Sequence, residues 1–226
     1  MVIGEVMDYS PLILSAKLAL VATGLLLVLA LPLTHGLTFA RFKGKFLVEA
    51  LVGLPLVLPP TVIGFYLLVA MGPDGGLGRL AQMVSGRPLV FTFAGMIVAS
   101  MIHTLPYAMQ PLKTAFERLD RRLLETAYVL GLSPVAAFFR VVLPNTMNGL
   151  AAAAVLAFAH CMGEFGVVLM VGGSIPGETR VASIAIYEYV ETLRYQEAWQ
   201  LSLALVLISY LVLLAVTFLN RGERYA

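Results

Sequence analysis

DRRLLETAYVLGLSPVAAFFRVVL, residues Asp120–Leu143, is the stretch that decides how this chain folds. It lies between two long apolar runs and has the residue pattern of folded structure. A helix is predicted from Asp120 to Leu130. Its apolar face consists of Leu123, Leu124, Ala127 and Tyr128. Gly131 follows at the position where a left-handed helix C-cap favours glycine. The stretch therefore contains one short helix with its own stop signal.

A second short helix is predicted directly after this glycine. Ser133 supplies an N-cap side chain, and Pro134 stands at the first helical position. Pro144 closes the unit. Apolar residues recur between them with helical spacing, at Val135, Phe138, Phe139, Val142 and Leu143. We therefore expect a short amphipathic helix-turn-helix at a membrane surface, although a segment that only anchors a loop in lipid has the same pattern.

The composition of the whole chain is that of a membrane protein. Of the 226 residues, 60% are hydrophobic and 12% are charged, whereas about 25% of the residues in an average soluble domain are charged. A soluble domain of this length could not bury so much apolar surface. The chain is therefore predicted to be an all-α integral membrane protein with a single domain, residues 1–226. The formal charge of only +2 predicts no bulk attraction to nucleic acid.

Five segments are long and apolar enough to be read as membrane spans, since a helix needs roughly 20 apolar residues to cross the hydrocarbon core. They are Leu12–Leu33, Phe46–Met71, Leu89–Leu112, Met147–Val171 and Trp199–Leu219. The second contains Pro55, Pro59 and Pro60 and must be kinked or broken there. The apolar stretch Ala182–Val190 is too short to span, so a count of six stays open if it is a partial or re-entrant helix.

Lysine and arginine side chains predict the orientation, because cytoplasmic loops are enriched in them. Ten lie on one predicted side and four on the other. The larger set is Arg41, Lys43, Lys45, Lys113, Arg118, Arg121, Arg122, Arg140, Arg221 and Arg224. The smaller set is Arg79, Arg87, Arg180 and Arg194. The N-terminus is therefore predicted outside, and the helix-turn-helix and the C-terminus in the cytoplasm.

The helix-turn-helix also matches a known motif. Glu125-Thr126-Ala127, then Gly131, then nine residues, then Val141-Val142-Leu143-Pro144 resembles the EAA loop of ABC importer permeases, with Thr126 and Val141 as conservative departures. The resemblance implies the transmembrane domain of a type I ABC importer, with a cytoplasmic coupling loop at residues 120–144. It implies that five residues couple this loop to an ATPase: Glu125, Ala127, Gly131, Leu143 and Pro144.

Two further runs resemble molybdate permeases. One is Leu54–Tyr66, which reads LPLVLPPTVIGFY, and the other extends from Gly163 to Tyr187. The resemblance covers residues 47–190 and implies a permease subunit that translocates molybdate across a bacterial cytoplasmic membrane. Sulfate and tungstate permeases have similar runs, so tungstate or sulfate/thiosulfate stay open as substrates.

The resemblance implies a division of labour with other subunits. Two ABC ATPase subunits, an extracytoplasmic molybdate-binding protein, a second copy of this chain and membrane lipid are the expected partners, with no nucleic acid and no cofactor. The sequence agrees that this chain is not itself the ATPase. A P-loop around Gly44-Lys45 would need glycine at position 39 and serine or threonine at position 46, and both positions are phenylalanine.

The pathway or gate is predicted in the second and fourth spans, which carry the prolines and the glycines. Neutral donors suit an oxyanion path, because a tight site would hinder release. Candidates of this kind are Thr61, Ser100 and Thr104. Gly163 and Gly166 permit close helix approach. Glu164 would repel an oxyanion, so a hydrogen bond to a neighbouring helix is the expected role, with gating as the alternative.

Two other classes of protein are considered. His103, His160 and Glu164 suggest an intramembrane metalloenzyme, and His160 and Glu164 share a helix face. The chain lacks the His-Glu-x-x-His run of zincins, so no metal site is expected and a packed histidine pair is the simpler explanation. A secondary transporter would commonly show internal repeats and paired broken helices, and only one proline-broken span is apparent.

Overall fold

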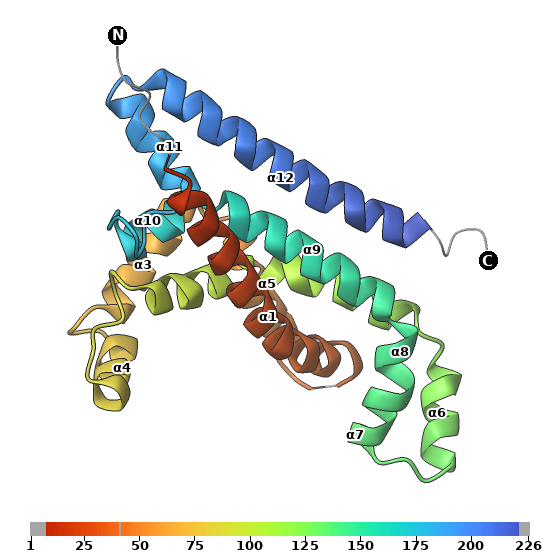
Figure 1. Ribbon diagram of the computed structural model, residues 1–226. Helices are drawn as coiled ribbons and strands as arrows, with labels where there is room; N and C mark the ends of the chain where they lie inside the picture. The colour runs from red at the N-terminus through yellow and green to blue at the C-terminus, as the bar shows by residue number, and fades with distance from the viewer. Residues whose placement is uncertain (1–7, 41, 222–226) are drawn as a thin grey trace.

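The computed structural model describes residues 8–40 and 42–221, and within them every regular element is a helix (Figure 1). The α-helices are α1 (Ser10–Phe39), α2 (Lys45–Gly53), α3 (Pro60–Met71), α4 (Gly76–Ser85), α5 (Phe93–Arg118), α6 (Arg121–Val129), α7 (Pro134–Ala137), α8 (Leu143–Asn145), α9 (Met147–Gly163), α10 (Gly166–Gly172), α11 (Ala182–Glu191) and α12 (Tyr195–Arg221). A 3-10 turn, Leu54–Leu56, follows α2, and a π-helical turn, Phe138–Val142, joins α7 to α8.

Helices α1, α5 and α9 pack against one another and form the centre of the bundle. Their shared core contains Leu26, Ala30, Leu112, Ala153 and Ala157, all of which are buried. Alanine and glycine let helix backbones approach closely where lipid offers no hydrophobic driving force. Helices α5 and α9 approach closely at Gly149, where an added Cβ atom would lie 2.3 Å from the Cβ of Ala115.

The number of membrane spans depends on how the helices are counted. By length and composition, two of the described helices can each cross a membrane: α1 and the Tyr195–Leu214 part of α12. The number rises to four if two sharply bent helix pairs each count as one span. Helix α5 is in neither group. Among its polar residues His103 is buried, whereas Gln110 is exposed and the side chain of Lys113 is 40% exposed. The count of five spans therefore stays a prediction.

The second predicted span is broken at its prolines, as expected. The chain bends by 111° between the segments Lys45–Leu56 and Pro60–Met71. Pro59 has an extended backbone conformation, and Pro60 begins α3 at the position where a missing N–H group has no consequence.

The fourth predicted span, Met147–Val171, is wrong as a continuous helix. Helix α9 ends at Gly163, the backbone of Glu164 is extended, and α10 begins at Gly166. The side chain of Glu164 stabilises this break, because its Oε1 accepts the Val167 N–H at 3.2 Å and so caps α10. Local hydrophobicity could not reveal the break, since apolar residues continue on both sides of it.

The ends of the other elements also differ from prediction. Helix α1 continues to Phe39 and α5 to Arg118, six residues beyond each predicted span. Helix α5 starts at Phe93 rather than Leu89, since Thr92 caps it by accepting the Gly95 N–H. The stretch predicted as a partial helix is α11, of 10 residues, which packs against α12.

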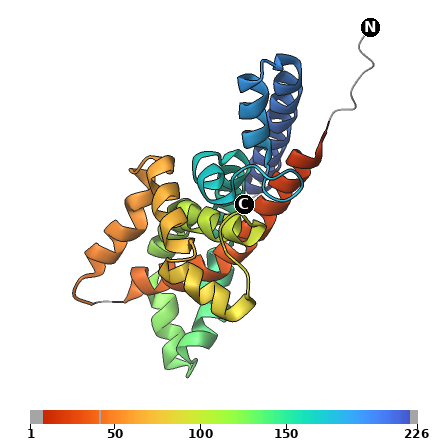
Figure 2. The same cartoon turned by 90° about the vertical axis from the view of Figure 1, so that its left-hand side faces the viewer.

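The predicted helix-turn-helix is present as α6 to α8, which project together from the ends of α5 and α9 (Figures 1 and 2). Asp120 caps α6 by accepting the Arg122 N–H, and Ser133 caps α7 by accepting the Ala136 N–H. Gly131 has a φ of +81°. The Leu132 N–H bonds to Ala127 O and the Gly131 N–H to Tyr128 O, which is the Schellman pattern. The turn chemistry predicted from the sequence is confirmed.

Only part of the predicted apolar face of α6 is buried within the chain: Leu124 and Ala127 are buried, whereas Leu123 and Tyr128 are 44% and 48% exposed. One other detail of this unit was predicted wrongly. Pro144 does not close the unit, because it lies inside α8. Two side chains beside this proline bond to nearby carbonyl groups: Asn145 Nδ2 donates to Val141 O and Thr146 Oγ1 to Val142 O.

A pair of reporters tests the predicted orientation. A reporter near Gly75, between α3 and α4, should be external, and one after Gly222 should be cytoplasmic, because of the ten-to-four distribution of Lys and Arg. Gly222, Arg41 and Arg224 lie outside the described residues. An enzyme that is active only outside the cytoplasm, fused in turn at each position, measures the side directly. Activity at both positions or at neither would contradict the five-span topology.

Candidate functional site

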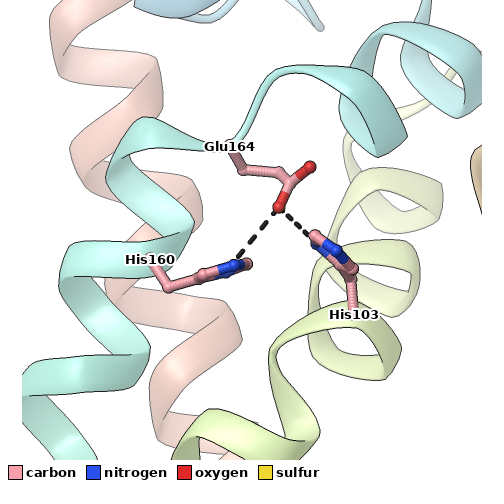
Figure 3. A group of neighbouring side chains, drawn as sticks. All are labelled: His103, His160 and Glu164. Carbon is pink, nitrogen blue, oxygen red and sulfur yellow. Dashed lines mark hydrogen bonds and ion pairs between the residues drawn. The ribbon is translucent and has the colours of Figure 1, made fainter. Parts of the chain in front are cut away.

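The break between α9 and α10 brings Glu164 against α5 inside the bundle (Figure 3). Its side chain is 3% exposed. Oε2 lies 2.5 Å from Nδ1 of His103, so the carboxylate accepts a hydrogen bond from a helix that is distant in the sequence. The backbone carbonyl of Glu164 accepts a further bond from the hydroxyl of Ser183 on α11. Glu164 thus connects the helix break to α5 and α11, which is the kind of contact expected from its sequence.

His160 lies one turn before Glu164 on α9 and completes the cluster. Its Nδ1 is 3.7 Å from Oε2 of Glu164 and 3.1 Å from the hydroxyl of Thr104. The ring is stacked on Tyr107, with ring centroids 3.9 Å apart. The Thr104 hydroxyl also contacts Sγ of Cys161, at 3.3 Å. The imidazole of His160 is therefore held by contacts with two groups of α5, while 19% of its side chain stays exposed.

Helix α3 packs against α10 on the other side of the break. An added Cβ at Gly166 would lie 2.8 Å from Cβ of Pro60, and one at Gly64 would lie 2.7 Å from Cβ of Met170. The two chain interruptions, one at the prolines and one at Glu164, are therefore in contact. Broken helices are tolerated at membrane depth only against protein or a cavity, and here both conditions occur.

A cavity of about 530 Å³ opens directly where the two interruptions meet. Its walls contain four of the predicted pathway residues: Thr61, Gly163, Glu164 and Gly166. The other lining residues are Pro60, His103, Ala159, His160 and Phe165. The irregular parts of the second and fourth predicted spans thus lie together at one cavity, and their role in a pathway or gate stays a prediction.

The two remaining pathway candidates are buried on α5 and do not line this cavity. Thr104 is 0% exposed and holds His160. Ser100 is also 0% exposed, and its hydroxyl has no hydrogen-bond partner within the described part of the chain. Sequence reasoning treated His103 and His160 only as a rival metal site or a packed pair. Their place on the cavity wall was missed, because it depends on how α5 packs against α9.

Three potential metal ligands do converge here. One atom from each of His103, His160 and Glu164 lies within 4.8 Å of the others. Two imidazoles and a carboxylate can bind a transition metal. In this arrangement, however, both oxygens of Glu164 and Nδ1 of each histidine are already engaged in hydrogen bonds within the chain.

The residues of the predicted coupling loop lie far from this cavity, on the α6–α8 unit. Ala127 is 3% exposed and packs under the loop with Phe116 and Val142. Glu125, Gly131 and Pro144 are exposed, and Leu143 is half-buried. The unit also exposes apolar side chains to its surroundings: Val129, Leu130, Val135 and Phe139 are 86%, 75%, 68% and 60% exposed.

Comparison with known sequences identifies one family. Residues 29–225 match the family described as the binding-protein-dependent transport system inner membrane component. The chain is 47% identical over 209 residues to the molybdenum transport system permease protein ModB of Azotobacter vinelandii, with 92% of each chain covered. It is 34% identical to ModB of Escherichia coli K12, with 86% of this chain and 89% of the other covered. A probable sulfate transport system permease protein, cysT of Prototheca wickerhamii, is 30% identical, with 88% and 78% covered.

Solved structures with the same fold come from ABC transporters. A chain of the MetNI methionine ABC transporter in inward facing conformations aligns with a TM-score of 0.73 and 18% identity, with 94% of each chain covered. A chain of a bacterial ABC transporter involved in the import of the acidic polysaccharide alginate aligns with a TM-score of 0.67 and 20% identity, with 94% of this chain and 79% of the other covered. At these identities the likeness concerns the fold.

Proposed function

Because this chain belongs to the family of binding-protein-dependent transport system inner membrane components, we propose that it is the permease that carries molybdate through the membrane in an ATP-driven importer. The chain is a membrane protein with the transmembrane fold of ABC importers. The observation that supports molybdate as the substrate is the 47% identity to a molybdenum transport permease over 92% of both chains. The relative named for sulfate transport is less similar, at 30% identity.

Energy comes from a separate ATPase subunit that docks on the α6–α8 unit. The apolar side chains exposed there, including Val129, Val135 and Phe139, support this role, because an exposed apolar patch commonly marks a protein interface. The rigid Schellman turn at Gly131 presents the two short helices in one fixed arrangement. Glu125, Gly131 and Pro144 lie on the exposed parts of the unit, where they would meet the partner.

Two copies of this chain line the pathway, and two ATPase subunits drive them. Two-fold symmetry is the commonest symmetry of homo-oligomers, and a half-size subunit needs a second copy to enclose a path. The molybdate arrives on a binding protein at the external face. The residues that would line the path are those at the cavity between α3, α5, α9 and α10, and the C-terminus lies in the cytoplasm.

Uptake by intact cells tests the proposed substrate. Cells that lack this chain should lose high-affinity molybdate uptake, and expression of the chain should restore it. Tungstate should compete in the complemented cells, because the two tetrahedral dianions are nearly the same in size and charge. Accumulated metal is measured by elemental analysis after a short exposure to micromolar molybdate. Loss of sulfate uptake with intact molybdate uptake would instead assign the chain to sulfate.

A further inference from the structure

Glu164 lines the cavity, and donors within the chain engage both of its carboxylate oxygens. Oε1 accepts the N–H of Val167, and Oε2 accepts a hydrogen bond from Nδ1 of His103 at 2.5 Å. The side chain is 3% exposed. A carboxylate with both oxygens occupied by donors presents little of its charge to a nearby anion. The carboxylate therefore does not exclude an oxyanion from this cavity. The repulsion expected from a carboxylate at this position in the sequence is reduced by these two hydrogen bonds.

Two further polar side chains, those of His160 and Thr61, line the cavity beside His103 and Glu164. The imidazole of His160 is fixed by Thr104 and Tyr107, and 19% of its side chain is exposed. The side chain of Thr61 is exposed at the start of α3, and its hydroxyl makes no hydrogen bond within the described part of the chain. These two groups come from different helices and line the same cavity. They can therefore converge on one ligand held between α3 and α9.

We infer that His160 and Thr61 form an oxyanion-binding site inside the membrane, with His103 and Glu164 as the residues that position it. This inference rests on the proposed function, and it names the residues that would contact the substrate. The cavity of about 530 Å³ has room for a tetrahedral oxyanion together with several waters, since one water takes up about 30 Å³ of liquid. Few and neutral donors give weak binding, which suits a site that an ion must leave again.

A resident metal fits the same residues less well. Two ligands of a tetrahedral ion, each about 2.0–2.2 Å from the metal, stand about 3.4 Å apart. His103 Nδ1 and Glu164 Oε2 are 2.5 Å apart, a hydrogen-bond distance. A metal between these atoms would separate them and would also remove the cap of α10 if it took both carboxylate oxygens. The contacts present favour the oxyanion.

Purified transporter in vesicles, with its ATPase, binding protein and ATP, tests the inference. We expect His160→Leu to lower oxyanion uptake per ATP hydrolysed about tenfold, since one hydrogen bond to a charged group is lost. His160→Gln keeps an N–H donor and should recover most of this loss. Thr61→Val should lower the same ratio. Thr23→Val is the matched control, because this buried threonine on α1 also has an unpartnered hydroxyl but lies outside the site.

Each alternative has its own result. Unchanged uptake in both His160→Leu and Thr61→Val would overturn the inference while the molybdate function stands. Equal losses in His160→Leu and His160→Gln, with lowered thermal stability in both, would assign the cluster to packing and overturn it too. A stoichiometric metal in the purified parent, with uptake lost on chelation, would replace the oxyanion site with a metal site. If the parent carries sulfate instead of molybdate, the proposed substrate fails, and the same variants test the site with sulfate.

Discussion

Gly131→Asp is expected to reduce oxyanion uptake by at least about tenfold, or 1.4 kcal/mol of coupling, while the chain stays inserted in the membrane. Gly131 has a φ of +81°, a conformation that costs an ordinary residue on the order of 1 kcal/mol. An added Cβ would meet no atom of the described chain within 4 Å. Packing inside the chain should therefore be unchanged. The substitution should alter only the exposed surface at this turn, where the partner would dock.

The physical reason for the large effect is the position of the glycine between the two short helices. The turn holds α6 and α7 in one arrangement through the bonds from Gly131 and Leu132 to the end of α6. A carboxylate there also lies at the C-terminus of α6, where negative charge is unfavourable. If this unit transmits the motion of an ATPase, a displaced turn breaks the physical link. ATP hydrolysis should persist while uptake falls.

Gly131→Asn is the matched control, because asparagine has nearly the shape of aspartate, is neutral and tolerates the left-handed conformation. It should retain more uptake than Gly131→Asp. Glu125→Gln should also be milder, since it changes charge without changing the turn. Subunit copurification and uptake are measured together in reconstituted vesicles. If Gly131→Asp copurifies and transports like the parent, residues 120–144 do not form the coupling loop.

Gly149→Ala is expected to destabilise the bundle by about 1–3 kcal/mol, the usual cost of overpacking. The new Cβ would lie 2.3 Å from Cβ of Ala115 and 3.1 Å from the carbonyl oxygen of Pro111. Neither neighbour is the end of a flexible side chain, so the helices α5 and α9 must move apart. The apparent midpoint of thermal unfolding in detergent should fall by several degrees, with a lower yield of monodisperse protein.

Two further variants check the cause of this loss. Adding Ala115→Gly to Gly149→Ala removes the Cβ of residue 115, with which the new Cβ clashes, and should restore most of the stability. Gly24→Ala makes the same substitution on α1, where no atom lies within 4 Å of the new Cβ. It should be neutral or slightly stabilising, because alanine is the better helix former by about 1 kcal/mol. Equal destabilisation at both glycines would show that close packing of α5 and α9 is not responsible.

The local chemistry of the chain could be predicted from its sequence. The caps at Asp120 and Ser133 and the turn at Gly131 depend on residues within a few positions of one another, so their pattern is visible in the sequence. The break at Pro59 and Pro60 follows from the missing N–H group of proline. The helical, membrane-embedded character of the chain follows from its hydrophobic content, since bilayer and backbone chemistry leave few alternatives.

The tertiary structure alone decided the rest. The break at Glu164 depends partly on a distant element, because the bond of its carboxylate to His103 joins residues 61 positions apart in the sequence, although its cap on Val167 is local. The same holds for His160, which reaches the cavity wall only because α5 and α9 cross closely enough for Thr104 and Tyr107 to hold its ring. Sequence patterns determine which faces are apolar and where helices begin, whereas packing between distant helices determines which polar side chains meet.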